Sequence, residues 1–376
     1  MNKQPKTTVR FRFNSAVILL SALVFLVPAL RDGSSTLYLL CVLVPCAVFL
    51  SCTLLARMFS LDRMLVTLSL WLSAAGIAAL AVSDPQAALA HTLRCGAGLA
   101  ALLVGGVLIR SLSPSMLTSA CTAFLGLLLL VGKLLSPSFT LPLTEAALSL
   151  LLIAFVSLLT RQGPVSALLC AGTALALLLY RGELAESLFW SLTVLLLLFS
   201  LDSRLIILLP SLAGTGILFY VAFLLFPVAS VSRDSLPAMV SAGAIGSDTL
   251  PEAFSALGNV SLFPRLAGHY GLIFAGFTGL LFLPLTLRGT TVAACARTRF
   301  HASLAMGVSL LLALRALAAL LSLFGLLPFS DVAIPFLTSS LPDLCAELFL
   351  IGLLCGISGR NEADLAEDAH LAMLAK

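Results

Sequence analysis

Charged residues are scarce in this sequence: Asp, Glu, Lys and Arg make up 10% of its 376 positions, against roughly 25% in soluble proteins. Hydrophobic residues make up 60%, and the mean hydropathy is +1.13. A single soluble core cannot absorb so many long apolar runs, whereas a helix of about 20 residues spans the hydrocarbon of a bilayer. The composition excludes a soluble domain and predicts an integral membrane protein.

The signatures of several other functions are also missing. The nine cysteines lie mostly inside apolar runs and have no CxxC spacing, which indicates buried packing residues and argues against a disulfide framework. The net charge of +4 is spread over short loops, so its sign concerns membrane topology and not an acidic partner. There is no short repeat of the solenoid kind. We therefore predict no metal site and no nucleic-acid partner.

The apolar runs predict an all-α fold, a polytopic integral membrane helical bundle of about 12 transmembrane helices. The first run follows a basic start and lacks a small-x-small cleavage site, so we expect it to be retained as a span or signal anchor. The predicted spans are 14–30, 36–56, 64–83, 88–109, 115–135, 141–160, 164–180, 185–201, 204–226, 267–287, 301–325 and 340–357.

The basic residues obey the positive-inside rule if the N-terminus is cytoplasmic. Of the 21 Lys and Arg residues, fourteen then lie inside and six outside, and Arg315 lies within a span. An even number of spans returns the chain to the side on which it started. We therefore expect a multi-pass protein with cytoplasmic N- and C-termini.

One connection, 227–267 on the predicted outer side, is much longer than the others. It contains Arg233, Asp248, Glu252 and Arg265 together with moderately apolar pieces. Loops of this length in a compact domain tend to be functional or disordered, and the apolar content with little Lys, Glu or Gln argues against disorder. We expect a functional extracytoplasmic loop.

Several ionisable residues lie inside or at the ends of predicted spans, where they are costly. Glu145 opens the span 141–160, although a first-turn acid is also expected from the helix dipole alone. Arg181-Gly182-Glu183-Leu184-Ala185-Glu186 links two spans and could equally be a solvated turn. Asp343 and Glu347 are four residues apart and share one helical face. We expect Arg315 to pair with one of these last two acids.

The stretch Phe324 to Arg360 reads as a hydrophobic hairpin that turns outside the membrane and re-enters. Pro328 and Pro335, on either side of Asp331, make a continuous helix through the turn unfavourable. Polar, proline-broken backbone beside a spanning helix is tolerated only where protein or water satisfies it. We therefore expect this hairpin to line a cavity.

The predicted topology places these charged groups on one side of the membrane. Membrane-embedded charge often marks a functional cavity, so we expect at least three of four features to lie close together in one outward-facing site. The four are Glu145, Glu183, the long loop and Asp343.

From Leu141 to Arg360 the order of motifs resembles the SEDS family, the FtsW/RodA/SpoVE group of cell-shape, division and sporulation proteins. Gly325-Leu326-Leu327-Pro328 with Ile334-Pro335-Phe336 resembles the family's G-[IL]-L-P-x-x-G-x-x-L-P-F. Leu141-Pro142-Leu143-Thr144-Glu145 stands where the family has Q-P-S-E, and Arg181 to Glu186 where it has Q-P-D-L-G-T. Ala244-Ile245-Gly246-Ser247 is similar to the family's A-I-G-S-G-G.

The chain departs from the family at positions that matter for activity. Family polymerases share a loop motif, L-P-E-x-H-T-D-F-I-F, whose aspartate the resemblance implies is catalytic. Leu250-Pro251-Glu252 matches the start of this motif, but Ala256 then stands in place of the aspartate; in the register set by Leu272-Ile273-Phe274, the position is Gly271. The lysine three residues after the Q-P-S-E glutamate is replaced by Leu148.

The resemblance divides the chain into three parts. Residues 1–62 hold a basic segment and two additional spans, 63–360 form the SEDS-like domain of ten spans with the long loop 227–267, and 361–376 form a short acidic cytoplasmic tail. The resemblance also implies the bacterial cytoplasmic membrane as the location.

The resemblance implies peptidoglycan synthesis from a lipid-linked disaccharide at the outer leaflet. The catalytic residue stays open, and a divalent cation as cofactor is compatible with the family. Partners would be the lipid-linked glycan precursor, membrane lipids and a penicillin-binding transpeptidase. The candidates for the base are Asp248, Glu252, Asp331 and Asp343, and those for binding substrate or diphosphate are Arg181, Arg233, Arg265, Glu145 and Glu183.

Three functions therefore remain open at this point. The first is a glycosyltransferase with a relocated carboxylate. The second is a non-catalytic relative that binds the precursor or a transpeptidase. The third is a multi-span transporter or lipid flippase, which would be recognised by discontinuous helices and pseudo-symmetric halves.

Overall fold

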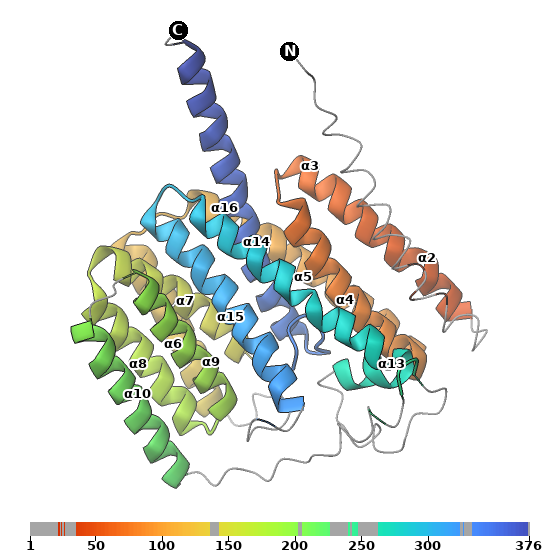
Figure 1. The fold of residues 1–376 in the computed structure, drawn as a ribbon, viewed down its shortest axis with the longest axis horizontal. Coiled ribbons are helices and arrows are strands. Elements are labelled where there is room, and N and C mark those ends of the chain that lie inside the picture. Colours follow the sequence, from red (N-terminus) through yellow and green to blue (C-terminus); the bar gives the residue numbers. More distant parts are fainter. Residues whose placement is uncertain are drawn as a thin grey trace.

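The computed structural model describes residues 22, 24, 26, 35–135, 143–201, 205–225, 240, 243–246, 262–323, 326 and 333–374. The regular elements of this part are helices, which stand roughly side by side as a bundle (Figure 1). They are α2 (Ser35–Leu50), η1 (Ser51–Leu55), α3 (Ala56–Met58), α4 (Arg63–Ser83), α5 (Pro85–Ser111), α6 (Met116–Leu135), α7 (Thr144–Arg161), α8 (Pro164–Tyr180), α9 (Leu184–Leu201), α10 (Leu205–Leu225), α13 (Phe263–Leu280), α14 (Phe282–Ala294), α15 (Arg299–Leu323) and α16 (Leu341–Leu374).

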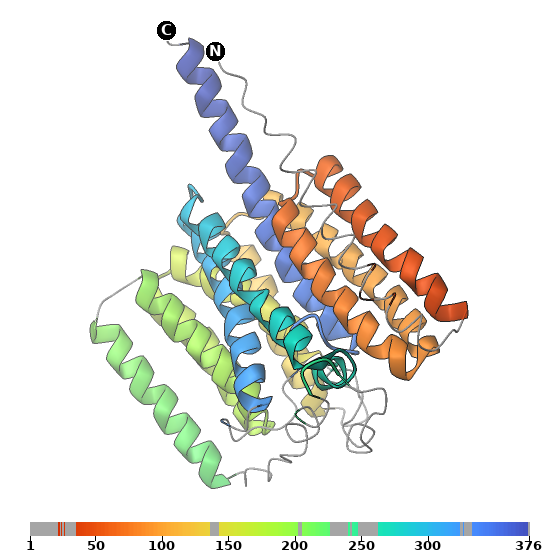
Figure 2. The same ribbon diagram turned by 45° about the vertical axis from the view of Figure 1, so that its right-hand side comes forward.

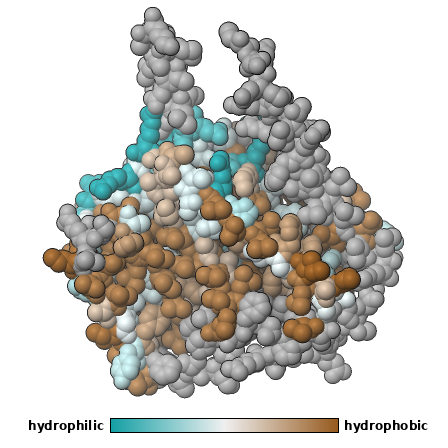
Figure 3. Space-filling model, viewed as in Figure 1, coloured by the Kyte–Doolittle hydropathy of each residue, from teal (hydrophilic) through white to brown (hydrophobic). Residues whose placement is uncertain are grey.

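The described helices confirm the polytopic all-α fold. Eight helical stretches are long and apolar enough to cross a membrane, and three shorter apolar helices accompany them. Together these eleven correspond to the predicted spans from 36–56 to 340–357. The predicted span 14–30 lies outside the described residues apart from positions 22, 24 and 26. Figure 3 shows the broad apolar belt that these helices present to lipid, with hydrophilic side chains at the end from which α16 projects.

The short turn between α4 and α5 is fixed by local sequence. The Asp84 side chain accepts hydrogen bonds from the backbone N–H groups of Gln86 and Ala87, and Pro85 occupies the first turn of α5. An aspartate cap followed by proline is a strong helix-start signal. The first N–H groups of a helix have no partner within it; the aspartate side chain accepts hydrogen bonds from them, and proline has no N–H to satisfy. The chain can therefore reverse direction between two spans within two residues.

The predicted span 267–287 lies within Phe263–Ala294, a stretch long and apolar enough to cross a membrane. It is not one straight helix: it divides into α13 and α14, and Gly271 within α13 has φ 87° and ψ 166°, far from helical values. The break follows from contact with the segment 243–246, because Leu272 N–H and Ile273 N–H donate to the carbonyls of Gly243 and Ala244.

The last helix is longer than predicted. We expected it to end near 357 and to be followed by a separate tail, but α16 continues without a break to Leu374 and projects beyond the bundle (Figure 1). Gly359 does not end the helix. A Cβ at this position would lie 2.6 Å from the Ser60 carbonyl oxygen, so the glycine is explained by close packing.

α5 and α16 are the most closely packed pair of helices in the described bundle. A Cβ on Gly352 of α16 would lie 2.1 Å from the Leu102 carbonyl oxygen of α5, and one on Gly105 would lie 2.5 Å from the Phe349 carbonyl oxygen. Small residues allow membrane helices to approach this closely, where van der Waals contact drives association. In the two ribbon views, α16 runs through the middle of the bundle beside α5 (Figures 1 and 2).

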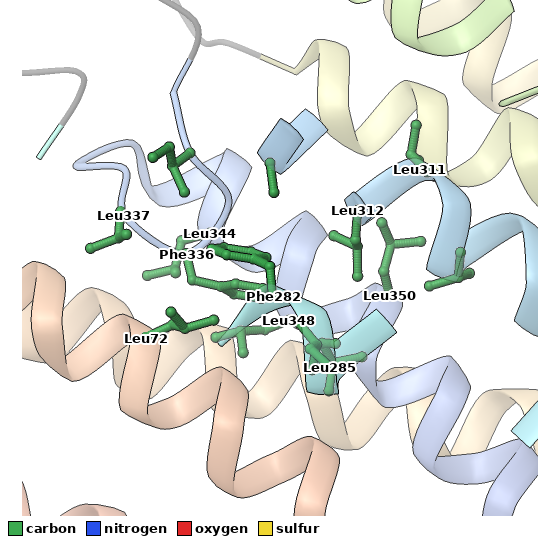
Figure 4. Close-up of a cluster of buried hydrophobic side chains, with 14 of the residues drawn as sticks. Leu72, Phe282, Leu285, Leu311, Leu312, Phe336, Leu337, Leu344, Leu348 and Leu350 are labelled. Atoms are coloured by element: carbon green, nitrogen blue, oxygen red, sulfur yellow. The ribbon is translucent and has the colours of Figure 1, made fainter. Parts of the chain in front are cut away.

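The turn before α16 is part of the hydrophobic core. Phe336 and Leu337 from this turn pack among Leu72 of α4, Phe282 of α14 and Leu344 of α16 (Figure 4). The rings of Phe282 and Phe336 are stacked with centroids 6.2 Å apart. Residues 333–340 are not helical, which confirms that the chain bends between α15 and α16. Residues 327–332, including Asp331, lie outside the described residues.

Candidate functional site

A buried ionic cluster joins three helices near one end of the bundle. Arg315 of α15 forms salt bridges with Glu145 of α7 and Glu186 of α9; its Nη2 lies 3.0 Å from Glu186 Oε1 and bonds Glu145 Oε1 as well. The side chains of Arg315 and Glu145 are only 5% and 9% exposed. We call Glu145, Glu186 and Arg315 the ion triad.

The ion triad is not fully satisfied within the described protein. Glu145 Oε2, Glu186 Oε2 and Arg315 Nε are buried and have no hydrogen-bond partner among the described residues. Unpaired polar atoms of charged groups cost free energy when they are buried, and charge inside a membrane protein commonly lines a functional cavity. The triad therefore has unused hydrogen-bonding capacity.

A second ion pair lies directly beside the triad. Arg181, in the turn between α8 and α9, donates to Glu183 Oε1 over 2.5 Å and to Thr144 Oγ1 over 3.2 Å. The Thr144 hydroxyl in turn donates to Glu183 Oε2 over 3.1 Å. Because Thr144 precedes Glu145 in the chain, this pair is continuous with the ion triad. In this turn the Arg181 side chain is only 7% exposed, whereas the Glu183 side chain is 22% exposed.

Two acids of α16 complete the cluster. Asp343 and Glu347 are buried and lie close enough to Glu145 and Arg315 for their charges to interact. Glu347 Oε2 accepts a hydrogen bond from Phe336 N–H over 2.5 Å. Phe336 has φ 66°, a conformation that non-glycine residues rarely adopt and that surrounding contacts must hold. We call the ion triad with Arg181, Glu183, Asp343 and Glu347 the acidic end.

The acidic end brings together Glu145, Glu183 and Asp343, as expected for the site residues. The predicted pairing of Arg315 with Asp343 or Glu347 is wrong, because its salt bridges are with Glu145 and Glu186. Arg181 was expected to hold a diphosphate, but Glu183 and Thr144 already occupy its Nη2 group. The roles of Glu145, Glu183, Asp343 and Arg181 in binding or catalysis stay predictions.

The other candidates lie elsewhere. Arg265 is in the first turns of α13, which packs on α4. Arg233, Asp248 and Glu252 of the long loop, and Asp331 of the hairpin, lie outside the described residues, so their roles also stay predictions.

Residues that we had not proposed for a site also lie at this end of the helices. Arg94 of α5 donates to the Ser339 carbonyl oxygen over 2.9 Å. His91, one turn earlier, is fully buried, and neither of its ring nitrogens has a hydrogen-bond partner among the described residues. In the sequence, both residues stand out because they are polar and lie near the start of the apolar span 88–109.

The break in α13 occupies the position that corresponds to the family aspartate in one register. A Cβ on Gly271 would lie 2.2 Å from the Ala244 carbonyl oxygen, and one on Gly246 would lie 2.1 Å from the His269 carbonyl oxygen. Both glycines also have positive φ, 87° and 92°. Backbone therefore packs against backbone here, and no side chain can be accommodated at Gly271 without moving the segment 243–246.

Replacing Gly271 by Asp is therefore expected to destabilise the protein and not to create activity. The side chain would collide with Ala244 and would need a backbone conformation that costs non-glycine residues about 1–3 kcal/mol. Thermal unfolding of the purified variant measures this loss. The part that comes from the backbone contact is isolated by comparing Gly271→Ala with Gly276→Ala, because a Cβ at position 276 meets nothing within 4 Å. Polymerase activity gained on Gly271→Asp at unchanged stability would contradict this interpretation.

The geometry of the described residues does not indicate a metal ion. Among the described residues no group of three or more His, Cys, Asp or Glu side chains is arranged to hold one. The described acids thus do not fit the divalent cation that the family resemblance allows, and we derive no step through a metal.

A separate polar cluster closes the opposite end of the bundle. The Asp62 carboxylate accepts hydrogen bonds from Met64 N–H and Leu65 N–H at the start of α4, and from the Ser358 hydroxyl of α16 over 3.0 Å. Arg288 of α14 forms a salt bridge with it at 2.6 Å. We call this the Asp62 cluster. It joins α4, α14 and α16 through groups that satisfy one another, as expected of a structural contact.

No protein-family model matches the sequence, but part of it is similar to curated FtsW proteins. A stretch of 90 residues is 37% identical to the probable peptidoglycan glycosyltransferase FtsW of Geobacter sulfurreducens, and 37% identical over 90 residues to that of Geobacter metallireducens. This stretch is 24% of the present chain and spans only 24% of each relative.

The fold is similar to solved structures over most of the chain. A chain of a peptidoglycan synthase complex superposes with a TM-score of 0.63 at 21% identity, covering 80% of the present chain and 98% of its own. The rod shape determining protein RodA of Thermus thermophilus superposes with a TM-score of 0.59 at 19% identity, covering 80% and 97%. These likenesses establish the fold. This multi-pass membrane protein therefore shares its fold with RodA and, over 90 residues, is similar in sequence to FtsW, which supports the resemblance to the SEDS family.

Proposed function

We propose that this protein works in peptidoglycan synthesis in the bacterial cytoplasmic membrane, where its acidic end faces outward and binds a lipid-linked glycan precursor. The observation that carries the proposal is the acidic end itself, a set of buried carboxylates with unpaired oxygens, on a fold shared with RodA. Sugar hydroxyl and amide groups are hydrogen-bond donors that such oxygens accept.

The chemistry of glycan transfer requires a base that takes a proton from the acceptor hydroxyl. Within the acidic end, Glu145 and Glu186 face Arg315, and Glu347 accepts from a backbone N–H. Asp343, in the first turn of α16, is the described acid that we infer to serve as the base. Asp248 and Glu252 of the long loop and Asp331 of the hairpin are the remaining candidates for this role.

Wild-type protein incubated with fluorescent lipid-linked disaccharide is expected to form glycan polymer, and Asp343→Asn is expected to lower the rate about 100-fold or more, as loss of a general base does. Gel separation of the products measures this. Glu362→Gln is the control, since Glu362 is an exposed acid on the far part of α16 and should leave the rate unchanged. If Asp343→Asn formed polymer at the wild-type rate, Asp343 would not be the base, and another acid would have to serve.

A second function is favoured by Gly271. The position that would hold the family aspartate in one register cannot carry a side chain, which is consistent with a relative that binds the precursor or a penicillin-binding transpeptidase without catalysis. Binding of the lipid-linked disaccharide without polymer, together with co-purification of a transpeptidase, would support this second function. Flux of substrate across sealed vesicles without polymer would instead support a flippase or transporter.

A further inference from the structure

The acid at position 145 has no cation within one helical turn of it on α7, whose one basic residue, Arg161, is in the last turn. Residues three apart on a helix lie on the same face and can pair, and the residue three positions after Glu145 is Leu148, which is buried with 1% exposure in the hydrophobic core. A carboxylate in this apolar setting needs a compensating charge, because an unpaired buried ion is strongly unfavourable.

The compensating charge comes from another helix. Arg315 lies on α15, 170 positions along the chain from Glu145, and donates to it and to Glu186 through the same nitrogen. α15 packs on both α7 and α9. One guanidinium therefore fixes the position of two carboxylates that belong to neighbouring helices, which a lysine at position 148 could do only for Glu145.

The geometry of the triad is poorly explained by stability alone. A buried ion triad contributes little relative to apolar residues of similar volume, and here Glu145 Oε2 and Glu186 Oε2 are left without partners among the described residues. A purely structural cluster, such as the Asp62 cluster, places its acceptors against donors within the protein.

We propose that Arg315 is a positioning residue: it holds one oxygen of Glu145 and one of Glu186, so that the second oxygens point toward hydroxyl or amide donors of the bound glycan. This inference rests on the proposed function. Arg315 itself touches the two acids and acts on the ligand through them. Arg315 on α15 supplies the counter-ion of Glu145, because Leu148, on the same helix as Glu145, carries no charge.

The test compares four variants of the full-length protein in lipid nanodiscs. Arg315→Gln breaks the triad. The double variant Arg315→Gln/Leu148→Lys places a new cation beside Glu145. The triple variant Glu145→Gln/Glu186→Gln/Arg315→Gln removes all three charges while keeping the side-chain shapes of the two acids. Arg360→Gln is the control, because Arg360 is an exposed arginine of α16 two residues beyond Ser358 of the Asp62 cluster, at the opposite end of the bundle from the triad. The readouts are thermal unfolding and the Kd of a fluorescent lipid-linked disaccharide.

We expect Arg315→Gln to lower the Tm by roughly 5 °C or more, since it leaves two buried acids without their counter-ion, and to weaken binding about tenfold or more. In the Arg315→Gln background, Leu148→Lys should restore much of the Tm and part of the binding, because the new lysine is a counter-ion for Glu145 and not for Glu186. The triple variant should unfold near the wild-type temperature and still bind about tenfold more weakly. Arg360→Gln should change neither.

Two results would overturn the inference. One is wild-type binding by a folded triple variant, which would make the triad irrelevant to the ligand. The other is a folded Arg315→Gln variant with unchanged Tm and Kd. If wild-type protein binds no lipid-linked disaccharide, the proposed function is wrong and the ligand-positioning role is overturned with it. The counter-ion role is then decided separately by whether Leu148→Lys restores the Tm of Arg315→Gln.

Discussion

Replacing Gly352 by Leu is expected to prevent α5 and α16 from pairing and to leave little folded protein. A Cβ at this position would lie 2.1 Å from the Leu102 carbonyl oxygen, 2.9 Å from its carbon and 3.0 Å from Gly106 N. These are backbone atoms of α5, so no rotamer change relieves the collision, and the helices would have to separate. Overpacking a core costs about 1–3 kcal/mol even where side chains can adjust, and we expect more than about 4 kcal/mol here.

Size-exclusion chromatography and thermal unfolding of the purified membrane protein measure this loss. The matched control is Gly96→Leu on α5, where a Cβ meets nothing within 4 Å. The control should elute and unfold as the wild type does. If Gly352→Leu were as stable as the control, the close α5–α16 contact described above would be incorrect.

Replacing Asp62 by Ala is expected to have the second-largest effect, about 3 kcal/mol of destabilisation. The change removes the side-chain cap of α4, which contributes about 1 kcal/mol. It also removes the partner of Arg288 and of the Ser358 hydroxyl, the latter being buried. Groups left without partners in a membrane interior are costly.

Two further variants separate these contributions in thermal unfolding. Asp62→Asn keeps a capping oxygen but loses the charge, so it should cost less than Asp62→Ala. Asp84→Ala removes the corresponding cap of α5, which is exposed, and should cost only about 1 kcal/mol. Equal effects of Asp62→Ala and Asp84→Ala would mean that the contacts of Asp62 with α14 and α16 add nothing to stability.

The helices were predictable because each span needs its own apolar run, which is a local property of the sequence. The break at Gly271 was not, since its positive φ is set by the segment 243–246, a contact between parts of the chain about 25 residues apart. The length of α16 was misjudged because the apolar run ends near 357, whereas the more polar residues that follow continue the same helix to Leu374.

The candidate site was predictable in outline and not in its pairing. The cost of charge in lipid indicated that Glu145, Glu183 and Asp343 would gather. The partner of Arg315 depends on how α7, α9 and α15 are rotated about their axes. Charge balance alone favoured Asp343 or Glu347, whereas in the structure Arg315 pairs with Glu145 and Glu186.

The position of the glycan site is tested most directly by photo-crosslinking of wild-type protein with a lipid-linked disaccharide that carries a photoreactive group on the sugar. Mass spectrometry of the labelled peptides identifies the helices that contact the ligand. We predict labels in the first turns of α7, α9 and α16, around Glu145, Glu186 and Asp343, competed by unlabelled disaccharide. Competed labels confined to the Asp62 cluster, or no competed label at all, would contradict a glycan-binding acidic end.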